Sequence, residues 1–274
     1  MRSVESFREK IKSGGACFGC AVGFSDPLIT YALADYFDFI WIEMEHCLMN
    51  QETVNGHVLA ACSKNTPLFA RVPGNHTHII KPLLDSGLQG IIVPQVKSAD
   101  EVEKLVEDCR YMPIGKRGFG PRIPTNFDQL DGNEYAAWSN KNIFVAVMIE
   151  NTDAVEALDE ILCVKALDSI IIGPSDLSYS MGFNGDTKHP EIHKAIVEII
   201  AKSKKAGKAI GAGVSPEPEA AKFMIDLGVN WLQLGNDHHY LTRYASNLTS
   251  EIRKIIKPGR IISEEDTICF QKKF

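Results

Sequence analysis

The segment "FDFIWIEMEH", residues 37–46, changes character abruptly along its length. Its first part is rich in aromatic and β-branched residues, which is typical of a buried strand. It then ends in three ionisable side chains, Glu43, Glu45 and His46. A buried strand followed at once by such side chains favours a sheet whose strand ends form a reactive site.

Short apolar runs of this kind recur along the chain, and eight of them have the length of a strand. They cover residues 17–24, 37–44, 67–72, 89–95, 143–150, 168–173, 209–214 and 230–235. Segments with helical periodicity separate most of these runs. In residues 189–209, for example, isoleucines recur on one helical face and Gly207 ends the helix. This alternation predicts an α/β fold with parallel strands covered by helices.

The length of the chain, 274 residues with 45% hydrophobic content, is enough for a core of barrel size. A doubly wound open sheet is the alternative, but no G-x-G-x-x-G loop follows the first strand. We therefore predict a single (β/α)8 TIM barrel over residues 1–257 and a short C-terminal extension over 258–274. Residues 112–141 form the longest connection that we expect to be irregular.

Composition and charge limit the classes of function. The net charge of −6 gives no electrostatic basis for binding nucleic acid or an anionic membrane. The apolar runs are too short to span a bilayer, and the N-terminus lacks an apolar signal core, so we expect a cytoplasmic protein. The cysteine count of seven is odd, which favours reduced thiols. Cys17 and Cys20 form a C-x-x-C motif within a strand, where we expect buried packing rather than redox or zinc chemistry.

Polar side chains gather at the predicted strand ends, which is where barrels of this type build their active sites. The second to sixth strands end in Glu43-Met44-Glu45-His46, Arg71, Pro94-Gln95, Glu150 and Gly173-Pro174-Ser175-Asp176. Acids, one imidazole and one guanidinium group are therefore expected to meet on one rim of the barrel.

Glu150 and Asp176 belong to adjacent strands with no cysteine or histidine pair beside them. Two carboxylates suit a hard divalent cation such as Mg²⁺ or Mn²⁺, with water and substrate as the other ligands. The alternative is structural: either acid forms a salt bridge, or Asp176 caps a helix that begins at Leu177.

His46 and Arg71 are the candidates for proton transfer and anion binding. His46 is a potential general base because its ordinary pKa lies near neutral pH, but a structural role is the common one for a lone histidine. Arg71 is suited to hold a carboxylate or an enolate oxygen, with a salt bridge between elements as the alternative. Lysine ends none of the predicted strands, which favours metal-assisted enolate chemistry over a Schiff base.

Several segments together resemble the HpcH/HpaI aldolase family, the class II pyruvate aldolases, over residues 15–245. They are "WIEMEH", "ARVPGN", "IKPLLDSGLQGIIVPQV", "RYMPIGKRGFGP", "VMIEN", "IIGPSDLSYSMGF", "HPEI" and "GKAIGAG". The resemblance implies a barrel of the phosphoenolpyruvate/pyruvate-binding type with a swapped C-terminal helix, assembled as a homohexamer, a trimer of dimers. It also implies reversible cleavage of a 4-hydroxy-2-oxo acid to pyruvate and an aldehyde, with a divalent metal such as Mg²⁺, Mn²⁺ or Co²⁺.

The resemblance also implies roles for individual residues. Glu150 and Asp176 resemble the metal ligands, and Arg71 resembles the arginine that stabilises the pyruvate enolate. His46 resembles the catalytic base, and Asp85 the acid that a neighbouring subunit supplies to pair with that histidine.

Further groups around this site are assigned in the same way. The backbone of Gly173, Pro174 and Ser175, at a helix N-terminus, is expected to receive the substrate carboxylate. Glu43 and Glu45 are expected to orient the histidine or the water around the metal.

Two positions differ from the usual pattern of the family. Glu43 stands where the family often has Asp, and Met148 stands where it often has Gln. Three other functions therefore stay open. They are oxaloacetate decarboxylation or related enolate chemistry on the same site, a coenzyme A thioester lyase, and a non-catalytic metabolite-binding barrel. The thioester lyase needs a basic surface, for which Lys116, Arg117 and Arg122 are the candidates.

Overall fold

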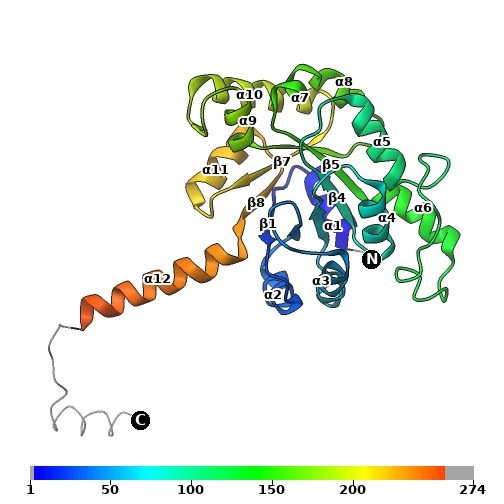
Figure 1. The fold of residues 1–274 in the computed structure, drawn as a ribbon, viewed down its shortest axis with the longest axis horizontal. Coiled ribbons are helices and arrows are strands. Elements are labelled where there is room, and N and C mark those ends of the chain that lie inside the picture. The colour runs from blue at the N-terminus through cyan, green and yellow to red at the C-terminus, as the bar shows by residue number, and fades with distance from the viewer. Residues whose placement is uncertain (1–2, 257–274) are drawn as a thin grey trace, which may run out of the picture. The chain divides into compact units, whose positions relative to one another are not determined.

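The computed structural model describes residues 3–256 and contains a closed barrel of eight parallel strands, with each strand paired to its neighbours in sequence and β8 paired to β1 (Figure 1). The strands are β1 (Cys17–Val22), β2 (Phe39–Glu43), β3 (Leu68–Arg71), β4 (Gly90–Val93), β5 (Phe144–Ile149), β6 (Ser169–Ile172), β7 (Ala209–Val214) and β8 (Trp231–Asn236). All eight predicted strands are present, and the predicted (β/α)8 barrel is confirmed.

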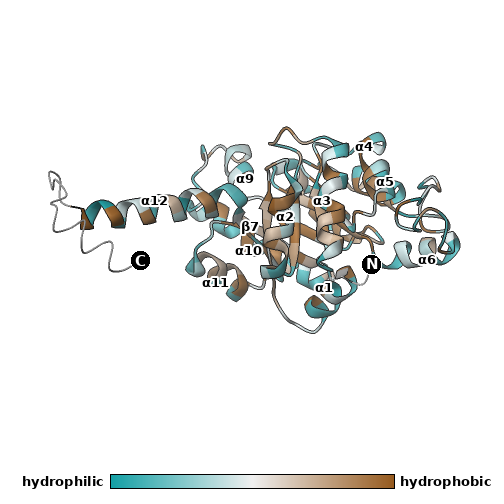
Figure 2. Cartoon of the chain, turned by 90° about the horizontal axis from the view of Figure 1, so that it is seen from below, coloured by the Kyte–Doolittle hydropathy of each residue, from teal (hydrophilic) through white to brown (hydrophobic). Residues whose placement is uncertain are grey.

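Helices precede the barrel and connect its strands. They are α1 (Ser3–Lys12), α2 (Pro27–Leu33), the 3₁₀ helix η1 (Ala34–Tyr36), α3 (Gln51–Ser63), α4 (Thr77–Asp85), α5 (Ala99–Cys109), α6 (Gly132–Asn142), α7 (Thr152–Glu156), α8 (Leu158–Cys163), α9 (Pro174–Ser180), α10 (Pro190–Lys205), α11 (Pro218–Leu227) and α12 (Asp237–Ile255). Figure 2 shows apolar residues gathered on the strands, as expected for a sheet that is buried on both faces.

The prediction of an irregular connection over residues 112–141 was wrong in its last third, where α6 begins at Gly132. The helix begins there because the carboxylate of Asp131 accepts hydrogen bonds from the backbone N–H groups of Asn133 and Glu134. Its apolar periodicity is weak because it carries many polar residues, so the sequence pattern did not reveal it.

A layer of aromatic rings fills the barrel at the N-terminal ends of the strands. Phe7 of α1 contacts this layer edge-on, at 5.0–6.1 Å between ring centres. The rings around it are Phe39, Phe69, Phe144 and Trp231, which come from four different strands. Because these rings are buried and interlocked, they close this end of the barrel and leave only the opposite end for a site.

Close approach between strands makes room for these large rings. A Cβ atom on Gly211 would lie 2.4 Å from the ring of Trp231, so β7 must carry a glycine there. The motif cysteines Cys17 and Cys20 are both buried free thiols, in agreement with the predicted buried packing.

The chain divides into a barrel unit, Met1–Asp237, and a second unit, His238–Phe274. In the second unit, α12 presents bands of apolar and polar residues along its length (Figure 2). The predicted extension over 258–274 lies outside the described residues, and the domain boundary at 257 stays a prediction. Within residues 3–256, no helix combines the length and the hydropathy that crossing a bilayer requires.

Candidate active site

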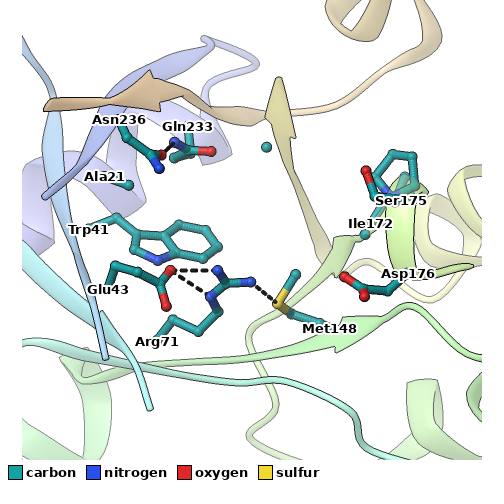
Figure 3. Close-up of a pocket in the computed structure, with 13 residues that line it drawn as sticks. Ala21, Trp41, Glu43, Arg71, Met148, Ile172, Ser175, Asp176, Gln233 and Asn236 are labelled. Carbon is teal, nitrogen blue, oxygen red and sulfur yellow. Dashed lines mark hydrogen bonds and ion pairs between the residues drawn. The ribbon is translucent and has the colours of Figure 1, made fainter. Parts of the chain in front are cut away.

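A pocket of about 140 Å³ opens at the C-terminal ends of the strands, where the sequence placed the site (Figure 3). Its lining residues come from seven strands, all except β4, and from the start of α9. They are Ala21, Trp41, Glu43, Arg71, Met148, Ile172, Gly173, Pro174, Ser175, Asp176, Gly213, Gln233 and Asn236. The pocket is polar at its rim and rests on the buried interior of the barrel.

Arg71 is held between two carboxylates. Its Nε and Nη2 atoms lie 2.7 and 2.6 Å from Oε2 of Glu43, and its Nη1 lies 3.1 Å from Oε2 of Glu45. The register explains the first contact, because Glu43 of β2 is the direct partner of Arg71 on β3. The guanidinium group therefore has a fixed orientation beside the pocket, with only 16% of its side chain exposed.

Glu43 also shapes the loop that follows β2. Its Oε1 accepts hydrogen bonds from the backbone N–H groups of Glu45, at 2.8 Å, and His46, at 3.1 Å. One carboxylate thus fixes both Arg71 and the chain around His46. This arrangement supports the orienting role that the sequence suggested for Glu43.

His46 lies beside this cluster but does not line the pocket. Its side chain is 64% exposed, and its Nε2 is 3.5 Å from Oε2 of Glu45. Burial raises the pKa of the Glu45 carboxyl, while the nearby Arg71 and His46 act in the opposite direction. Glu45 is therefore the group that connects the exposed imidazole to Arg71.

Glu150 lies directly after β5 and is 1% exposed. Its Oε1 accepts a hydrogen bond of 2.8 Å from the backbone N–H of Gln95, while its Oε2 is buried without a hydrogen-bond partner among the described residues. Burial raises the pKa of Glu150 to about 7, and the negative charge of Asp176 adds to the shift. A buried, unpartnered carboxylate oxygen of this kind is suited to a cation.

Gly173 allows the Glu150 carboxylate to lie where it does. A Cβ atom at position 173 would come within 2.5 Å of Oε2 of Glu150. The next element, α9, has Gly173 as its N-cap and Pro174 as its first residue. Asp176 lies in the first turn of this helix and makes no cap, so the alternative that it caps a helix at Leu177 was wrong.

The pair Glu150 and Asp176 fits a divalent metal in its donor chemistry. Both are oxygen donors, their charges interact, and one oxygen of Glu150 is buried and unpartnered. Among the residues that the structure describes, no group of three or more His, Cys, Asp or Glu side chains is placed to hold a metal. A metal at this pair would therefore take its remaining ligands from water and substrate.

Of the three residues whose backbone was predicted to bind the substrate carboxylate, not all have an N–H group available for it. The N–H of Gly173 donates to the carbonyl of Ile149, and Pro174 has no N–H. Ser175 has the next N–H of the helix, and first-turn N–H groups have no partner inside a helix. It is therefore the first backbone donor at this end of α9 that points towards the pocket lining.

Asp85 is not brought to His46 within one chain. It is the last residue of α4, a helix that runs back towards the N-terminal ends of the strands, with β4 beginning at Gly90. There its Oδ1 forms an ion pair of 2.6 Å with Nη2 of the buried Arg117. A role for Asp85 beside His46 therefore requires a second copy of the chain.

Pocket residues inside the strands were missed by reading only the strand ends, among them Trp41, Gln233 and Ala21. Trp41 is 3% exposed and its ring lies 5.7 Å from the guanidinium carbon of Arg71. Gln233 follows the inward-facing Trp231 by two positions. The period of two along each strand was the available signal for both residues.

Comparison with known proteins decides the family. The chain matches the HpcH/HpaI aldolase/citrate lyase family over residues 21–243. The chain belongs to this family. The resemblance seen in the sequence is thereby confirmed, as is the prediction of a lyase of the aldolase type.

Relatives of the HpcH/HpaI family match nearly the whole chain. A 4-hydroxy-2-oxo-heptane-1,7-dioate aldolase of Shigella sonnei is 34% identical over 258 residues, covering 93% of this chain and 98% of the relative. A hydroxypyruvate/pyruvate aldolase of Roseovarius nubinhibens is 31% identical over 251 residues, covering 91% and 97%. Among solved structures, an HpcH/HpaI aldolase of Desulfitobacterium hafniense superposes with a TM-score of 0.86 at 27% identity, covering 92% and 97%.

Proposed function

We propose that this HpcH/HpaI family member cleaves a 4-hydroxy-2-oxo acid reversibly to pyruvate and an aldehyde. One observation supports the proposal most directly. Arg71 is held beside the pocket by two carboxylates, and the site also contains two acids suited to a cation, Glu150 and Asp176. Aldol cleavage passes through an enolate, so a site for it needs positive charge where that oxygen develops. Arg71 supplies such charge, and a divalent cation held by Glu150 and Asp176 would supply more of it.

Glu150 and Asp176 are proposed to hold a divalent metal ion, Mg²⁺, Mn²⁺ or Co²⁺. When bound, the ion supplies Lewis acidity for the 2-oxo group and the carboxylate of the substrate. A bound cation would also relieve the repulsion between the buried Glu150 and the exposed Asp176, which raises the pKa of Glu150.

The residues of the chain then have separate roles. Arg71 donates hydrogen bonds to the enolate oxygen, and the N–H of Ser175 binds the substrate carboxylate. His46 takes the proton of the 4-hydroxyl group as the C3–C4 bond breaks. The bonding electron pair passes to the pyruvate enolate, which is protonated at C3, and the aldehyde leaves. Glu43 and Glu45 orient Arg71 and the loop of His46.

Assembly is part of the proposal. His46 is exposed, and Asp85 lies at the other end of its own barrel, so the two can meet only between copies. The second unit offers a device for association, because α12 carries exposed apolar residues at helical spacing. They are Leu241, Tyr244, Leu248, Ile252 and Ile255. We propose that α12 packs against another copy and that the enzyme is a homohexamer, a trimer of dimers.

The direct test is pyruvate release from a racemic 4-hydroxy-2-oxo acid by chelator-treated enzyme, with and without added Mg²⁺, Mn²⁺ or Co²⁺. Release that depends on metal supports the proposal. Absence of release with every metal, from protein shown to be folded and oligomeric, contradicts it. Asp85→Ala provides the assembly test, because mixing it with inactive His46→Ala should restore activity if the two residues act between subunits.

Oxaloacetate decarboxylation is a second candidate, because the same cation-suited pair and Arg71 would stabilise the same enolate. A parallel assay with oxaloacetate separates the two by their relative kcat/KM. The thioester lyase is less well supported by the structure. Arg117 is buried and paired with Asp85, and Lys116 is paired with Glu107, which leaves the exposed Arg122 as the one candidate of the three without an ion pair among the described residues.

A further inference from the structure

The pocket has two walls of different chemistry. One wall, from β3, β5, β6 and α9, contains Arg71, Met148 and the acid Asp176. The other wall, from β1, β2, β7 and β8, has two neutral polar side chains, Gln233 and Asn236. Figure 3 shows these amides side by side, across the pocket from Asp176 and Ser175. We call this second wall the amide wall; it consists of Ala21, Trp41, Gly213, Gln233 and Asn236.

The hydrogen bonds of Gln233 fix which atom it presents. Its Nε2 donates to the backbone carbonyl of Gly235 and, at 2.9 Å, to Oδ1 of Asn236. A carbonyl can only accept, so the nitrogen must face Gly235, and both amide hydrogens are used. The oxygen Oε1 faces the neighbouring strand, where a Cβ atom on Gly213 would lie 2.8 Å from it. Oε1 accepts no hydrogen bond within residues 3–256.

We infer that the amide wall is an acceptor subsite that selects aldehydes bearing a hydroxyl group. This inference rests on the proposed function, since it concerns the aldehyde half of the same substrate. In the proposed function, the oxo-acid half of the substrate binds at Arg71 and at the metal site of Glu150 and Asp176. The aldehyde half would then lie against the amide wall. A hydroxyl group of the aldehyde donates its proton to Oε1 of Gln233, whose position is held by Gly235 and Asn236.

The same wall disfavours a second carboxylate on the aldehyde. Arg71 is the one cationic side chain among the residues that line the pocket, and it lies on the opposite wall, paired with Glu43 and Glu45. Oε1 of Gln233 would repel an anion, because a carboxylate can only accept hydrogen bonds. The indole N–H of Trp41 has no partner among the described residues but carries no charge, so a carboxylate on the aldehyde would lack a counter-charge at this wall. Neutral hydroxyaldehydes are therefore selected over carboxylated ones.

The test measures kcat/KM for aldol addition of pyruvate, in the presence of divalent metal, to three aldehydes. Glycolaldehyde and propionaldehyde differ only by a hydroxyl in place of a methyl group, and succinic semialdehyde carries a carboxylate. We expect Gln233→Leu to lower the ratio of the kcat/KM for glycolaldehyde to that for propionaldehyde by about two- to twelvefold, the range for one neutral hydrogen bond. Wild-type enzyme should use succinic semialdehyde at least about tenfold less well than glycolaldehyde.

Two further variants keep the test decisive. Gly213→Ala should lower the same ratio, because the added Cβ atom would displace Oε1 of Gln233 although no residue of β8 is replaced. Gln129→Leu changes an exposed glutamine outside the pocket and should leave the ratio as in wild type. An unchanged ratio in Gln233→Leu, or in Gly213→Ala if the first variant does not fold, overturns the inference. So does a wild-type preference for the carboxylated aldehyde.

Failure of the subsite and failure of the proposed function are distinguishable. Exchange of the pyruvate methyl protons for deuterium, followed by NMR, requires enolate formation but no aldehyde. Metal-dependent exchange with no hydroxyl preference overturns only the subsite. Absence of exchange with every metal overturns the proposed function, and the subsite with it.

Discussion

The two ends of the barrel interior differ in what their side chains do, although the same strands supply both. At the N-terminal ends, the rings of Phe69, Phe144 and Trp231 pack around Phe7, and the indole N–H of Trp231 donates to the hydroxyl group of Ser169. At the C-terminal end of β3, two positions beyond Phe69, Arg71 is held by a pair of carboxylates. On β3, a residue that stabilises the barrel and a residue of the candidate site are therefore only two positions apart.

Glu150 and the aromatic rings also differ in how burial affects their contribution to stability. The aromatic layer gains from burial, because its side chains have no charge to desolvate. Burial of Glu150, in contrast, raises the pKa of its carboxyl to about 7, so the ionised group opposes folding. The ionised Glu150 thus lowers the stability of the metal-free protein, whereas the aromatic rings raise it. Removing the charge should therefore stabilise the protein, and removing a ring should destabilise it.

The largest effect is expected at the aromatic end. Phe69→Ala should lower the free energy of unfolding by about 3–5 kcal/mol, because a fully buried ring leaves a cavity that its stacked neighbours cannot fill. Denaturant unfolding followed by fluorescence measures it. Tyr36→Ala, at an 80% exposed position, is the control and should change stability by less than about 0.5 kcal/mol. Equal effects of the two variants would show that the buried aromatic layer contributes no more to stability than an exposed ring.

The second effect lies at the pocket end and has the opposite character. Glu150→Gln should lower kcat by about 10²–10³-fold, the scale for losing one charge-stabilising group. The folded pKa of Glu150 lies above its ordinary value, so the carboxyl opposes folding as the pH rises from about 4.5 to about 7. Metal-free Glu150→Gln should therefore be more stable than wild type at pH 8 and similar at pH 4.5.

Thermal unfolding of metal-free protein at the two pH values, together with the aldol assay, measures both parts of this prediction. A loss of stability in Glu150→Gln at pH 8 would contradict the assignment of a buried, unpaired carboxylate. Retained activity would contradict its role in the proposed reaction.

The third effect separates charge from geometry at Arg71. Arg71→Lys keeps a cation but loses the planar group that reaches Glu43 through two nitrogens. We expect kcat/KM to fall by about 10- to 100-fold, corresponding to ~1.5–3 kcal/mol for charge-assisted hydrogen bonds. Pyruvate proton exchange is the assay. Lys104→Arg, an exposed exchange outside the pocket, serves as the control. Full activity in Arg71→Lys would show that only the charge matters.

The smallest effect is expected at Met148, which differs from the usual residue of the family. Its Sδ lies 3.7 Å from Nη1 of Arg71, a weak contact. Met148→Leu conserves volume and should change stability and activation free energy by less than about 1.5 kcal/mol each. Unfolding and steady-state kinetics on one preparation measure both. A large loss of activity would assign Met148 a direct part in binding substrate.

Much of the barrel was predictable because its signals are local. Strand-length apolar runs, such as residues 168–173, reflect burial on both faces of a parallel sheet. The end of α10 near Gly207 was also visible, since Gly207 adopts a φ of 69° that few other residues tolerate. The helix α6 was missed because a cap at Asp131, not an apolar stripe, defines its start.

The site was predictable only in part. Glu43, Arg71 and Asp176 were expected at the mouth of the barrel because they stand at the ends of strands that a barrel must align, and all three line the pocket. The role of each residue stays a prediction. Gln233 was missed because it lies inside a strand, where inward and outward positions alternate. Its role depends on partners along and across the sheet, Asn236 and Gly213, that sequence distance does not reveal.

The eight strands, their parallel order and the end of the barrel at which the pocket opens could all be read from the sequence, because hydrophobic periodicity and strand-end position are local properties. Only the tertiary structure decided how charges are paired and which atoms remain free. It placed Arg71 between two acids, left Oε2 of Glu150 buried without a hydrogen-bond partner among the described residues, and turned the amide oxygen of Gln233 towards Gly213. Burial and electrostatic fields depend on neighbours distant in sequence, so they exist only once the barrel has closed.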